Sequence, residues 1–548
     1  MTENSRRGRK IARRACDLCR DRRIQCTFPD ESAAACRRCL QAGVSCTFLT
    51  ERKPRGPPSR HVVQARQRAE AIQLARQSPN PLPIGRITVA QFLPEPIFLA
   101  VLDDYLHRVY PLLPYVHVPT FASRLASRDY ERDQLFFQLC LAVCAATIAS
   151  IPRTLDSYGI TSYSDTGEMV DRASNLVLVG RLTLGTNWMD RPSVDSIIIS
   201  LLLAMASHYA GRSIAGWAYT SEASHCFREM ELYKEESYEK LNKIEAELCK
   251  RCFWLILIIN IHDRMSYIVP HTGLAYDPKH TSWEFLLPLE LSDEQLLDPA
   301  AISTSTPVIS GFVALIHVFT CMFDLLDTAF PGAPSYFQLT SSSLSARLFA
   351  DAIQEPQHSI GVSDDHILDP LVLVMARLEG TLGKVPDSLK LPSLGSPPLS
   401  HLMGPRKAEQ FEIMRANIHI TSIYIQSMTL EMCLSKLEGR RPPSSNTQET
   451  DLSPQNSGLI DQLWKMRESV AQELLSIVNV SAPAVLEANG NSMESKIREI
   501  AATFLDQEVT REGGMGDMER RNREYLAKFA EVLAKVDYTT APRSMSHE

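Results

Sequence analysis

Apolar residues recur every three or four positions through most of the chain beyond residue 96, which is the period of an amphipathic or buried α-helix. The longest apolar runs are Ile197 to Ala206 and Cys252 to Ile261, and few segments alternate as a β-strand does. The pattern therefore predicts a large all-α domain over residues 96–540. Its helices are expected near residues 97–110, 131–150, 168–183, 193–209, 214–232, 243–268, 308–329, 366–382, 405–436, 459–478, 493–508 and 516–536.

Proline-rich stretches interrupt the chain before this domain. Prolines 54, 57 and 58 follow the N-terminal segment, and prolines 79, 81, 83, 94 and 96 come before the helices. Because proline disrupts continuous helix, residues 47–95 are expected to form a linker. Within it, residues 62, 65, 69 and 72 keep a coiled-coil spacing for scarcely two heptads. This leaves open whether the segment dimerises or packs as a single helix on the all-α domain, which is called the body below.

A second interruption lies inside the helical domain. The segment near residues 437–458 is rich in Ser, Pro, Asn and Gln and poor in apolar residues. Such a composition cannot bury enough apolar surface to order the backbone. We therefore expect a disordered loop there.

Six cysteines near the N-terminus repeat in two halves, each with the spacing C-x2-C-x6-C: Cys16, Cys19, Cys26, Cys36, Cys39 and Cys46. Zinc takes four thiolates in a tetrahedron, and a C-x2-C pair can place two sulfurs on one metal. Two separate sites would need eight sulfurs, so six can complete two sites only by sharing two of them. Because the halves repeat, Cys16 and Cys36 are the natural shared ligands. The spacing predicts two zinc ions in a cluster over residues 16–46.

Disulfides are the alternative use of these cysteines. The N-terminal residues carry no apolar segment of a secretory signal, and the remaining cysteines look like ordinary buried thiols. Cys249 and Cys252 form a further C-x2-C, but they fall within a helical pattern without a second pair. We therefore expect metal binding in the N-terminal segment and two buried thiols in the body.

The net charge of −7 is unevenly distributed along the chain. Residues 1–60 carry 15 Lys and Arg against 6 Asp and Glu, whereas the rest of the chain carries 42 against 58. Residues 1–15 form a basic arm, expected to act in nuclear import or as a phosphate clamp. A cationic head on an acidic body is the electrostatic pattern of a protein that binds nucleic acid through one end. The longest apolar runs fall short of the ~20 residues that span a bilayer, so no membrane contact is expected.

The first half of the cysteine motif reads CDLCRDRRIQC from Cys16 to Cys26. It resembles the fungal binuclear zinc cluster family of transcription factors, whose first half runs C-x2-C-R-x-R/K-K-x-K-C. In that family the first helix enters the major groove, and the basic residue three before the third cysteine reads a CGG triplet. The resemblance assigns base reading to Arg23, with Arg20 and Arg22 as positioning contacts.

Two positions depart from the family pattern. Arg23 stands where the family usually has Lys, but Arg still donates two hydrogen bonds to guanine O6 and N7. Gln25 stands where the family usually has Lys, so we expect a weaker phosphate contact. Arg37 and Arg38 lie at the expected start of a second short helix, where they are expected to meet phosphates and fix register without reading sequence.

Two segments of the body resemble the same family. The stretch YLHRVYPLLPYVHVPTF from Tyr105 to Phe121 is similar to the opening of the fungal-specific transcription factor domain. The stretch EAELCKRCFW from Glu245 to Trp254 is similar to a helix of that domain that ends in a Phe-Trp pair. The helical register places Glu247 within reach of Lys250 or Arg251. The same register predicts core positions at Leu248, Cys252 and Leu255.

Nothing in the sequence supports catalysis. It contains no P-loop, no dinucleotide-binding glycine motif, no H-E-x-x-H and no G-x-S-x-G. His262 and Asp263 lack a nucleophile context, so we expect an interhelical contact there. The fold class is mostly α, with a small zinc-organised two-helix cluster joined by a linker to a large all-α helical domain.

The expected function is that of a nuclear, sequence-specific DNA-binding regulator of RNA polymerase II genes. Its expected partners are double-stranded DNA and a coregulator or a small-molecule effector acting on the helical domain, while a homodimer with a second copy of the chain stays open. Two alternatives stay open: a metal-buffering or redox-sensing protein, and a zinc module that binds only a protein partner.

Overall fold

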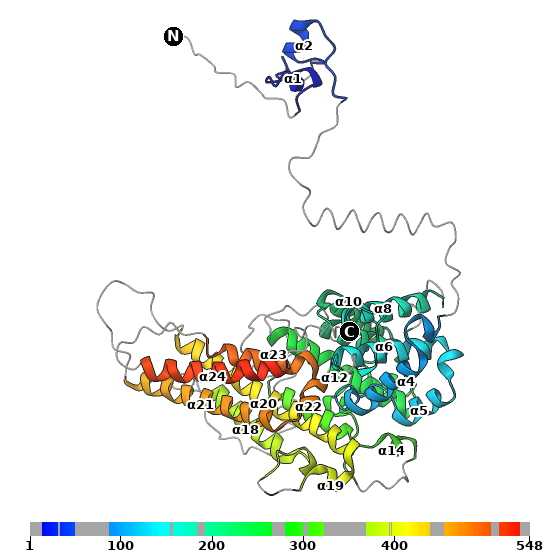
Figure 1. Cartoon of the computed structure of the whole chain (residues 1–548), viewed down its shortest axis with the longest axis vertical. Coiled ribbons are helices and arrows are strands. Elements are labelled where there is room, and N and C mark those ends of the chain that lie inside the picture. The colour runs from blue at the N-terminus through cyan, green and yellow to red at the C-terminus, as the bar shows by residue number, and fades with distance from the viewer. Residues whose placement is uncertain are drawn as a thin grey trace, which may run out of the picture. The chain divides into compact units, whose positions relative to one another are not determined.

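The structure is a computed structural model (Figure 1), and it describes residues 14–30, 33–49, 87–153, 157–183, 192–265, 280–298, 300, 305–322, 369–393, 395, 397–438, 454–505 and 515–536. The chain divides into two compact units, Met1–Pro83 and Ile84–Glu548. The regular elements of these described residues are helices, as the sequence pattern predicts. The expected coiled-coil segment near residues 62–72 lies outside the described residues.

The first unit contains two short helices, α1 (Asp17–Asp21) and α2 (Arg37–Ala42). Each begins directly after the first cysteine of one half of the repeat. The Asp17 carboxylate lies in the first turn of α1, where a negative charge suits the positive end of the helix. Five of the six cysteines are buried, and they form the centre of this unit with only a few small apolar contacts around them. So small an apolar core needs another source of stability.

The second unit opens with a group of mutually packed helices. In this group α6 packs against α4, α8 and α9, while α10 packs against α9. Every residue of α6 from Phe136 to Ser150 is buried, because this helix is apolar on all sides. The bounds are α4 (Glu95–Asp104), α5 (Val118–Ala126), α6 (Gln134–Ser150), α8 (Thr166–Thr183), α9 (Val194–Tyr209), α10 (Ser213–Glu229), α11 (Glu235–Tyr238) and α12 (Lys243–Met265), with short turns η1 (Val89–Gln91), η2 (Tyr105–Val109) and η3 (Asp129–Glu131).

The rest of the second unit is organised around one long helix, α20. It contacts α15, α18, α19, α21, α22 and α23, and α24 packs on α21 and α23 (Figure 1). Helix α23 also touches α6 and α9, so the two groups share one hydrophobic core. The bounds are α13 (Trp283–Leu286), α14 (Asp293–Leu297), α15 (Ile309–Thr320), α18 (Asp369–Lys384), η5 (Asp387–Leu389), α19 (Leu399–Met403), α20 (Pro405–Glu438), α21 (Pro454–Val480), α22 (Pro483–Ala488), α23 (Gly490–Ala502) and α24 (Met515–Val536).

Each helix predicted in the body from apolar periodicity has a counterpart in the structure, although the predicted ends at 266–268, 323–329, 366–368 and 506–508 lie outside the described residues. The short helices α5, α11, α13, α14, α19 and α22 were not expected, because one or two turns show too little periodicity. At both ends of the expected loop near 437–458 the structure has helix: α20 runs to Glu438 and α21 starts at Pro454, a residue suited to the first helical turn. Residues 439–453 of that segment lie outside the described residues. Buried Ile87 and Phe92 show that the packed body begins before residue 96.

No helix among the described residues combines the length and the apolar character that crossing a bilayer would require.

A buried polar hub joins both segments that the sequence analysis singled out in the body. Asp293 Oδ2 accepts hydrogen bonds from Tyr110 Oη at 2.8 Å and from the Val118 backbone N at 2.8 Å. Asp293 Oδ1 pairs with Arg251 Nη2 at 3.2 Å, and Arg251 Nη1 donates to the Pro114 carbonyl at 3.1 Å. The exposed fractions of the Arg251 and Asp293 side chains are 1% and 6%. The hub therefore fixes the 105–121 segment against α12 and α14 through buried, charge-assisted bonds.

The glycine at position 311 allows α15 and α20 to approach closely. A Cβ atom there would lie 2.0 Å from Met414 Sδ and 2.8 Å from Met414 Cγ. Gly311→Ala is therefore expected to lower the free energy of unfolding by about 1–3 kcal/mol through overpacking. Urea unfolding followed by circular dichroism measures the change.

Gly383 in α18 is the matched control, because an added Cβ there meets nothing within 4 Å. Gly383→Ala should leave stability equal or raise it by about 0.5–1 kcal/mol, since alanine favours helix. Equal effects of the two substitutions would show that the contact with Met414 is not the reason for glycine at 311.

Candidate metal centre and nucleic-acid interface

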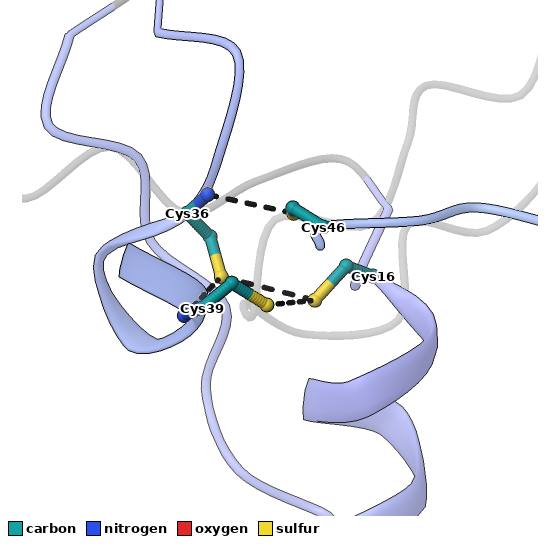
Figure 2. A group of neighbouring side chains, drawn as sticks. All are labelled: Cys16, Cys36, Cys39 and Cys46. Carbon is teal, nitrogen blue, oxygen red and sulfur yellow. Dashed lines mark hydrogen bonds between the residues drawn. The ribbon is translucent and has the colours of Figure 1, made fainter. Parts of the chain in front are cut away.

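The six N-terminal cysteines converge on one point in the first unit. Their sulfurs form two groups of four in which all ligand atoms lie within 4.8 Å of one another. One group is Cys16, Cys19, Cys26 and Cys36, and the other is Cys16, Cys36, Cys39 and Cys46. Figure 2 shows the second group, with the sulfurs of Cys16, Cys36 and Cys39 directed toward one another. Cys16 and Cys36 belong to both groups, as the repeat in the sequence predicts for shared ligands.

The distances between these sulfurs fit a tetrahedral zinc site. The Sγ atoms of Cys16 and Cys36 lie 3.7 Å apart, those of Cys16 and Cys39 3.6 Å, and those of Cys19 and Cys36 3.7 Å. A zinc tetrahedron with Zn–S bonds of about 2.3 Å has sulfurs about 3.8 Å apart, whereas a disulfide needs about 2.05 Å. All six cysteines are free thiols. The donor set therefore suits thiolate ligation of zinc.

Backbone hydrogen bonds repeat across the two halves. The Asp17 N–H donates to the Thr47 carbonyl at 2.9 Å, and the equivalent Arg37 N–H donates to the Thr27 carbonyl at 2.9 Å. Each helix is thus tied at its start to the residue that follows the last cysteine of the other half. The arrangement is a pseudo-twofold repeat whose two halves each complete the other.

The side chains that follow the third cysteine of each half reinforce this exchange. The rings of Phe28 and Phe48 stack with centroids 6.4 Å apart. Asp17 Oδ2 accepts hydrogen bonds from Thr47 Oγ1 and from the Leu49 backbone N, both at 2.8 Å. The sequence analysis placed Asp17 only at a helix start. The structure shows that it also binds the segment after Cys46 to α1.

The two shared thiols differ electrostatically from the others. Burial raises the pKa of Cys36, but the hydrogen bond from the Cys39 backbone N–H and the neighbouring sulfurs outweigh it and lower that pKa to about 6. The pKa of Cys16 is lowered in the same way, against burial, by the Cys19 backbone N–H. Burial raises the pKa values of the other cysteines, Cys19 and Cys39 most strongly. Because each shared cysteine precedes a helix, helix N-termini favour the thiolate at both shared positions.

The basic residues expected to meet DNA surround this cluster. Arg20 lies on α1, and its Nη2 atom is 3.6 Å from Asp17 Oδ1. Arg22 and Arg23 follow the end of this helix. The side chains of Arg22, Arg23, Gln25, Arg37 and Arg38 are all exposed. Within the described part of the chain, Arg22, Arg23, Arg37 and Arg38 form no ion pair. These cations are therefore available to phosphate or base edges.

Arg23 has an unusual backbone conformation. Its φ of 51° lies in the left-handed region, which favours glycine. The equivalent position of the second half is Gly43, with φ of 64°. The two residues close the same turn, since Arg23 N donates to the Arg20 carbonyl and Gly43 N donates to the Leu40 carbonyl. A strained residue where the repeat provides a glycine is typical of a functional position.

The other motifs of the body have structural roles. Cys249 and Cys252 are buried thiols in α12, and the groups able to hold a metal among the described residues are the two N-terminal ones. The His262 ring contacts the Phe319 ring edge-on at 5.3 Å, and Asp263 accepts from Trp217 Nε1 at 3.4 Å. The expected interhelical contacts of both residues are confirmed.

The predicted register of α12 is confirmed, with one refinement. Leu248, Cys252 and Leu255 are buried. Glu247 pairs with Lys250 at 3.0 Å, whereas Arg251 pairs with Asp293.

Sequence reasoning missed the buried cation Lys496 on α23. Its signal was present in the sequence, because Met493, Ile497 and Ile500 surround it on the same helix face at the spacing of core positions. A lysine within such a stripe is rarely buried without a reason.

Comparisons with known proteins agree with this geometry. Residues 14–56 match the fungal Zn(2)-Cys(6) binuclear cluster domain, and residues 102–298 match the fungal specific transcription factor domain. The zinc cluster domain implies zinc binding by the cysteine cluster. Both are transcription-factor domains and not enzyme families, in agreement with the lack of catalytic motifs. No solved structure matches the chain.

Curated relatives extend the similarity beyond these domains. The chain is 24% identical over 323 residues to the maltose fermentation regulatory protein MAL13 of Saccharomyces cerevisiae, covering 58% of this chain and 60% of the relative. It is 24% identical over 331 residues to MAL63 of the same species, covering 58% and 62%. A stemphyloxin II biosynthesis cluster transcription factor, sthR of Phaeosphaeria nodorum, is 29% identical over 124 residues, or 22% of this chain and 28% of the relative.

The matches span about three fifths of the length of the maltose regulators. The chain is therefore similar both to these two domains and to fungal proteins that are named as regulators. Residues 14–56 and 102–298 thus match, in this order, a fungal binuclear zinc cluster domain and a fungal specific transcription factor domain.

Proposed function

We propose that this chain is a nuclear, zinc-dependent, sequence-specific DNA-binding regulator of genes transcribed by RNA polymerase II. The cationic first unit, its thiolate cluster and the two matched domains support this proposal. The relatives that are named as regulatory proteins support the same class of function.

In this proposal each group of four sulfurs holds one zinc ion, and Cys16 and Cys36 bind both ions. The metal supplies the stability that the small apolar core of the first unit lacks. The cluster then holds α1 and α2 at fixed angles through the sulfurs that begin each helix.

The proposed DNA contacts divide into one base reader and several positioning residues. Arg23 donates to guanine O6 and N7 in a CGG triplet in the major groove. Arg20, Arg22, Gln25, Arg37 and Arg38 contact the phosphate backbone, which fixes register without reading sequence. The observation that carries this assignment is the exposed Arg23 in a left-handed conformation at the position where the repeat places Gly43.

The remaining parts have regulatory roles in this proposal. Residues 1–15 act in nuclear import or phosphate binding, and residues 47–95 connect the cluster to the body and permit a homodimer. The helical body, residues 96–540 with the segment before it, receives a small-molecule effector or a coregulator and controls the cluster.

Arg23→Ala tests the base reader. Arginine and alanine both carry a Cβ, so the strain of the left-handed backbone at φ of 51° is similar in the two proteins. Any change in DNA affinity therefore reports the loss of the arginine side chain. The substitution is expected to weaken binding to a CGG duplex by about 1–3 kcal/mol while leaving a scrambled duplex nearly unaffected. Fluorescence anisotropy with the zinc-loaded full chain measures both affinities.

Arg37→Ala is the matched control from the second half of the repeat. It should weaken the CGG and scrambled duplexes alike and reduce the salt dependence of binding. If wild-type protein shows no preference for CGG over scrambled DNA, sequence-specific recognition is wrong. If both variants lose affinity without any change in preference, Arg23 is not the base reader.

A further inference from the structure

The helical body contains a cavity of about 330 Å³ that the DNA-binding proposal does not use. Side chains of α9, α12, α15, α20 and α23 line it. Small-molecule sites in proteins typically have volumes of about 300–1,000 Å³, so this cavity is large enough for a compact ligand.

The lining separates into an apolar side and a polar side. Helices α12 and α15 contribute the apolar side: Leu255, Ile258, Ile259, Phe312, Leu315 and Phe319. Helix α23 contributes Asn491, Ser492, Lys496 and Glu499. A cavity of this kind fits a molecule with a hydrocarbon part and one polar end.

Lys496 is the exceptional member of the polar side. Its exposed fraction is 3%. An ammonium group has three donors, and Lys496 Nζ uses one of them on Thr421 Oγ1 at 2.8 Å. Its Nζ also lies 5.8 Å from the centroid of the Phe319 ring. No carboxylate among the described residues lies within ion-pair distance of it, so two donors remain for a ligand.

Glu499, one turn further along α23, does not neutralise this lysine directly. The Tyr424 hydroxyl donates a hydrogen bond to the Glu499 carboxylate, and burial raises the pKa of Glu499. On α12, Asp263 accepts from Trp217 Nε1 at 3.4 Å. Both carboxylates therefore have partners of their own.

The histidines that face the cavity add no positive charge at neutral pH. Burial lowers the pKa of His262 on α12 to about 3, with Lys496 contributing in the same direction. Burial also lowers the pKa of His208 on α9. Burial lowers the pKa of Lys496 to about 7, partly offset by Glu499. Lys496 is thus the cavity group whose charge an anion would stabilise.

We propose that this cavity is a binding site for a small organic carboxylate with an apolar tail. The carboxylate accepts hydrogen bonds from Lys496, and the tail lies against the apolar side chains of α12 and α15. The inference rests on the effector role proposed above for the helical body and gives it a site and a class of ligand, and its test does not depend on DNA binding.

The test uses zinc-loaded full-length protein and three probes that share one hydrocarbon chain: hexanoate, hexan-1-ol and hexylammonium. Isothermal titration calorimetry near pH 6 should show hexanoate binding about tenfold or more tightly than the alcohol, because a desolvated charge pair adds to the same apolar contact. Hexylammonium should bind most weakly. Lys496→Met should remove the preference for hexanoate, whereas Lys528→Met, at an exposed lysine of α24, should retain it.

Proton uptake provides a second measurement that needs no variant. Above pH 7 the free lysine is largely neutral, so hexanoate must bind together with a proton, and its affinity should fall by up to about tenfold per pH unit. Binding of hexan-1-ol should change little over the same range. Calorimetry in two buffers of different ionisation enthalpy reports the proton directly. Equal affinities for hexanoate and hexan-1-ol, no binding of hexanoate, or binding without proton uptake above pH 7 would each overturn the proposal.

Discussion

Cys36→Ser is expected to abolish both proposed zinc sites. Cys36 Sγ belongs to both groups of four sulfurs, so its loss leaves three thiolates in each group. A serine hydroxyl is a poor replacement for a soft thiolate ligand. Structural zinc contributes roughly 10–16 kcal/mol to the folding of small zinc domains, so the first unit should lose its fold. Mass spectrometry of the purified full chain should show a fall from two zinc ions to none, together with loss of binding to a CGG duplex.

Two further variants make this result specific. Cys46 belongs to one group only, so Cys46→Ser should release one zinc ion directly. Cys321 lies in the body, where its sulfur donates to the His317 carbonyl at 3.4 Å, and a hydroxyl can do the same. Cys321→Ser should keep both zinc ions. Loss of one zinc ion in both Cys36→Ser and Cys46→Ser would contradict the sharing of Cys36.

Asp293→Ala is expected to destabilise the helical body by about 3–5 kcal/mol, since it leaves the buried Arg251 guanidinium without its counter-ion. The Tyr110 hydroxyl and the Val118 N–H lose their acceptor in the same step. Urea unfolding followed by circular dichroism should show a lower midpoint for the body.

The matched control is Asp387→Ala, because Asp387 also pairs with a cation but its side chain is 95% exposed. Its pairing with Lys390 is a surface ion pair, so its removal should change the unfolding midpoint little. The double variant Arg251→Met/Asp293→Ala should recover part of the loss, because no unpaired charge remains buried. If Asp293→Ala behaves like Asp387→Ala, the hub does not hold the body together.

The features that could be predicted from sequence are those encoded locally. The repeated cysteine spacing indicated which sulfurs could be shared, because the two halves are equivalent before any folding is known. Helices such as α6 and α9 were predictable because a long apolar run of helical period permits few other structures. The start of α21 at Pro454 was missed because the polar composition of residues 437–458 led to the prediction of a loop, although a proline can begin a helix.

Pairings over long separations could not be predicted in the same way. Arg251 and Asp293 are 42 residues apart, and Tyr110 and Asp293 are 183 apart. The helical register showed that Arg251 lay within reach of Glu247, but the ion pair forms with Asp293, which the sequence does not place nearby. Lys496 is similar: its place in an apolar stripe was visible, but the cavity beside it arises only when five helices meet.

The left-handed turn at Arg23 sets stability and recognition against each other. Glycine at this position would relieve the backbone by roughly 1–2 kcal/mol, yet it would discard the proposed contact with guanine. Selection for stability of the cluster alone would therefore favour glycine at this position, at the loss of the proposed base recognition. The second half of the repeat, with Gly43, already has the relaxed form of this turn. The asymmetry between the halves fits the proposed roles, in which the turn at Arg23 reads DNA and the turn at Gly43 only supports the fold.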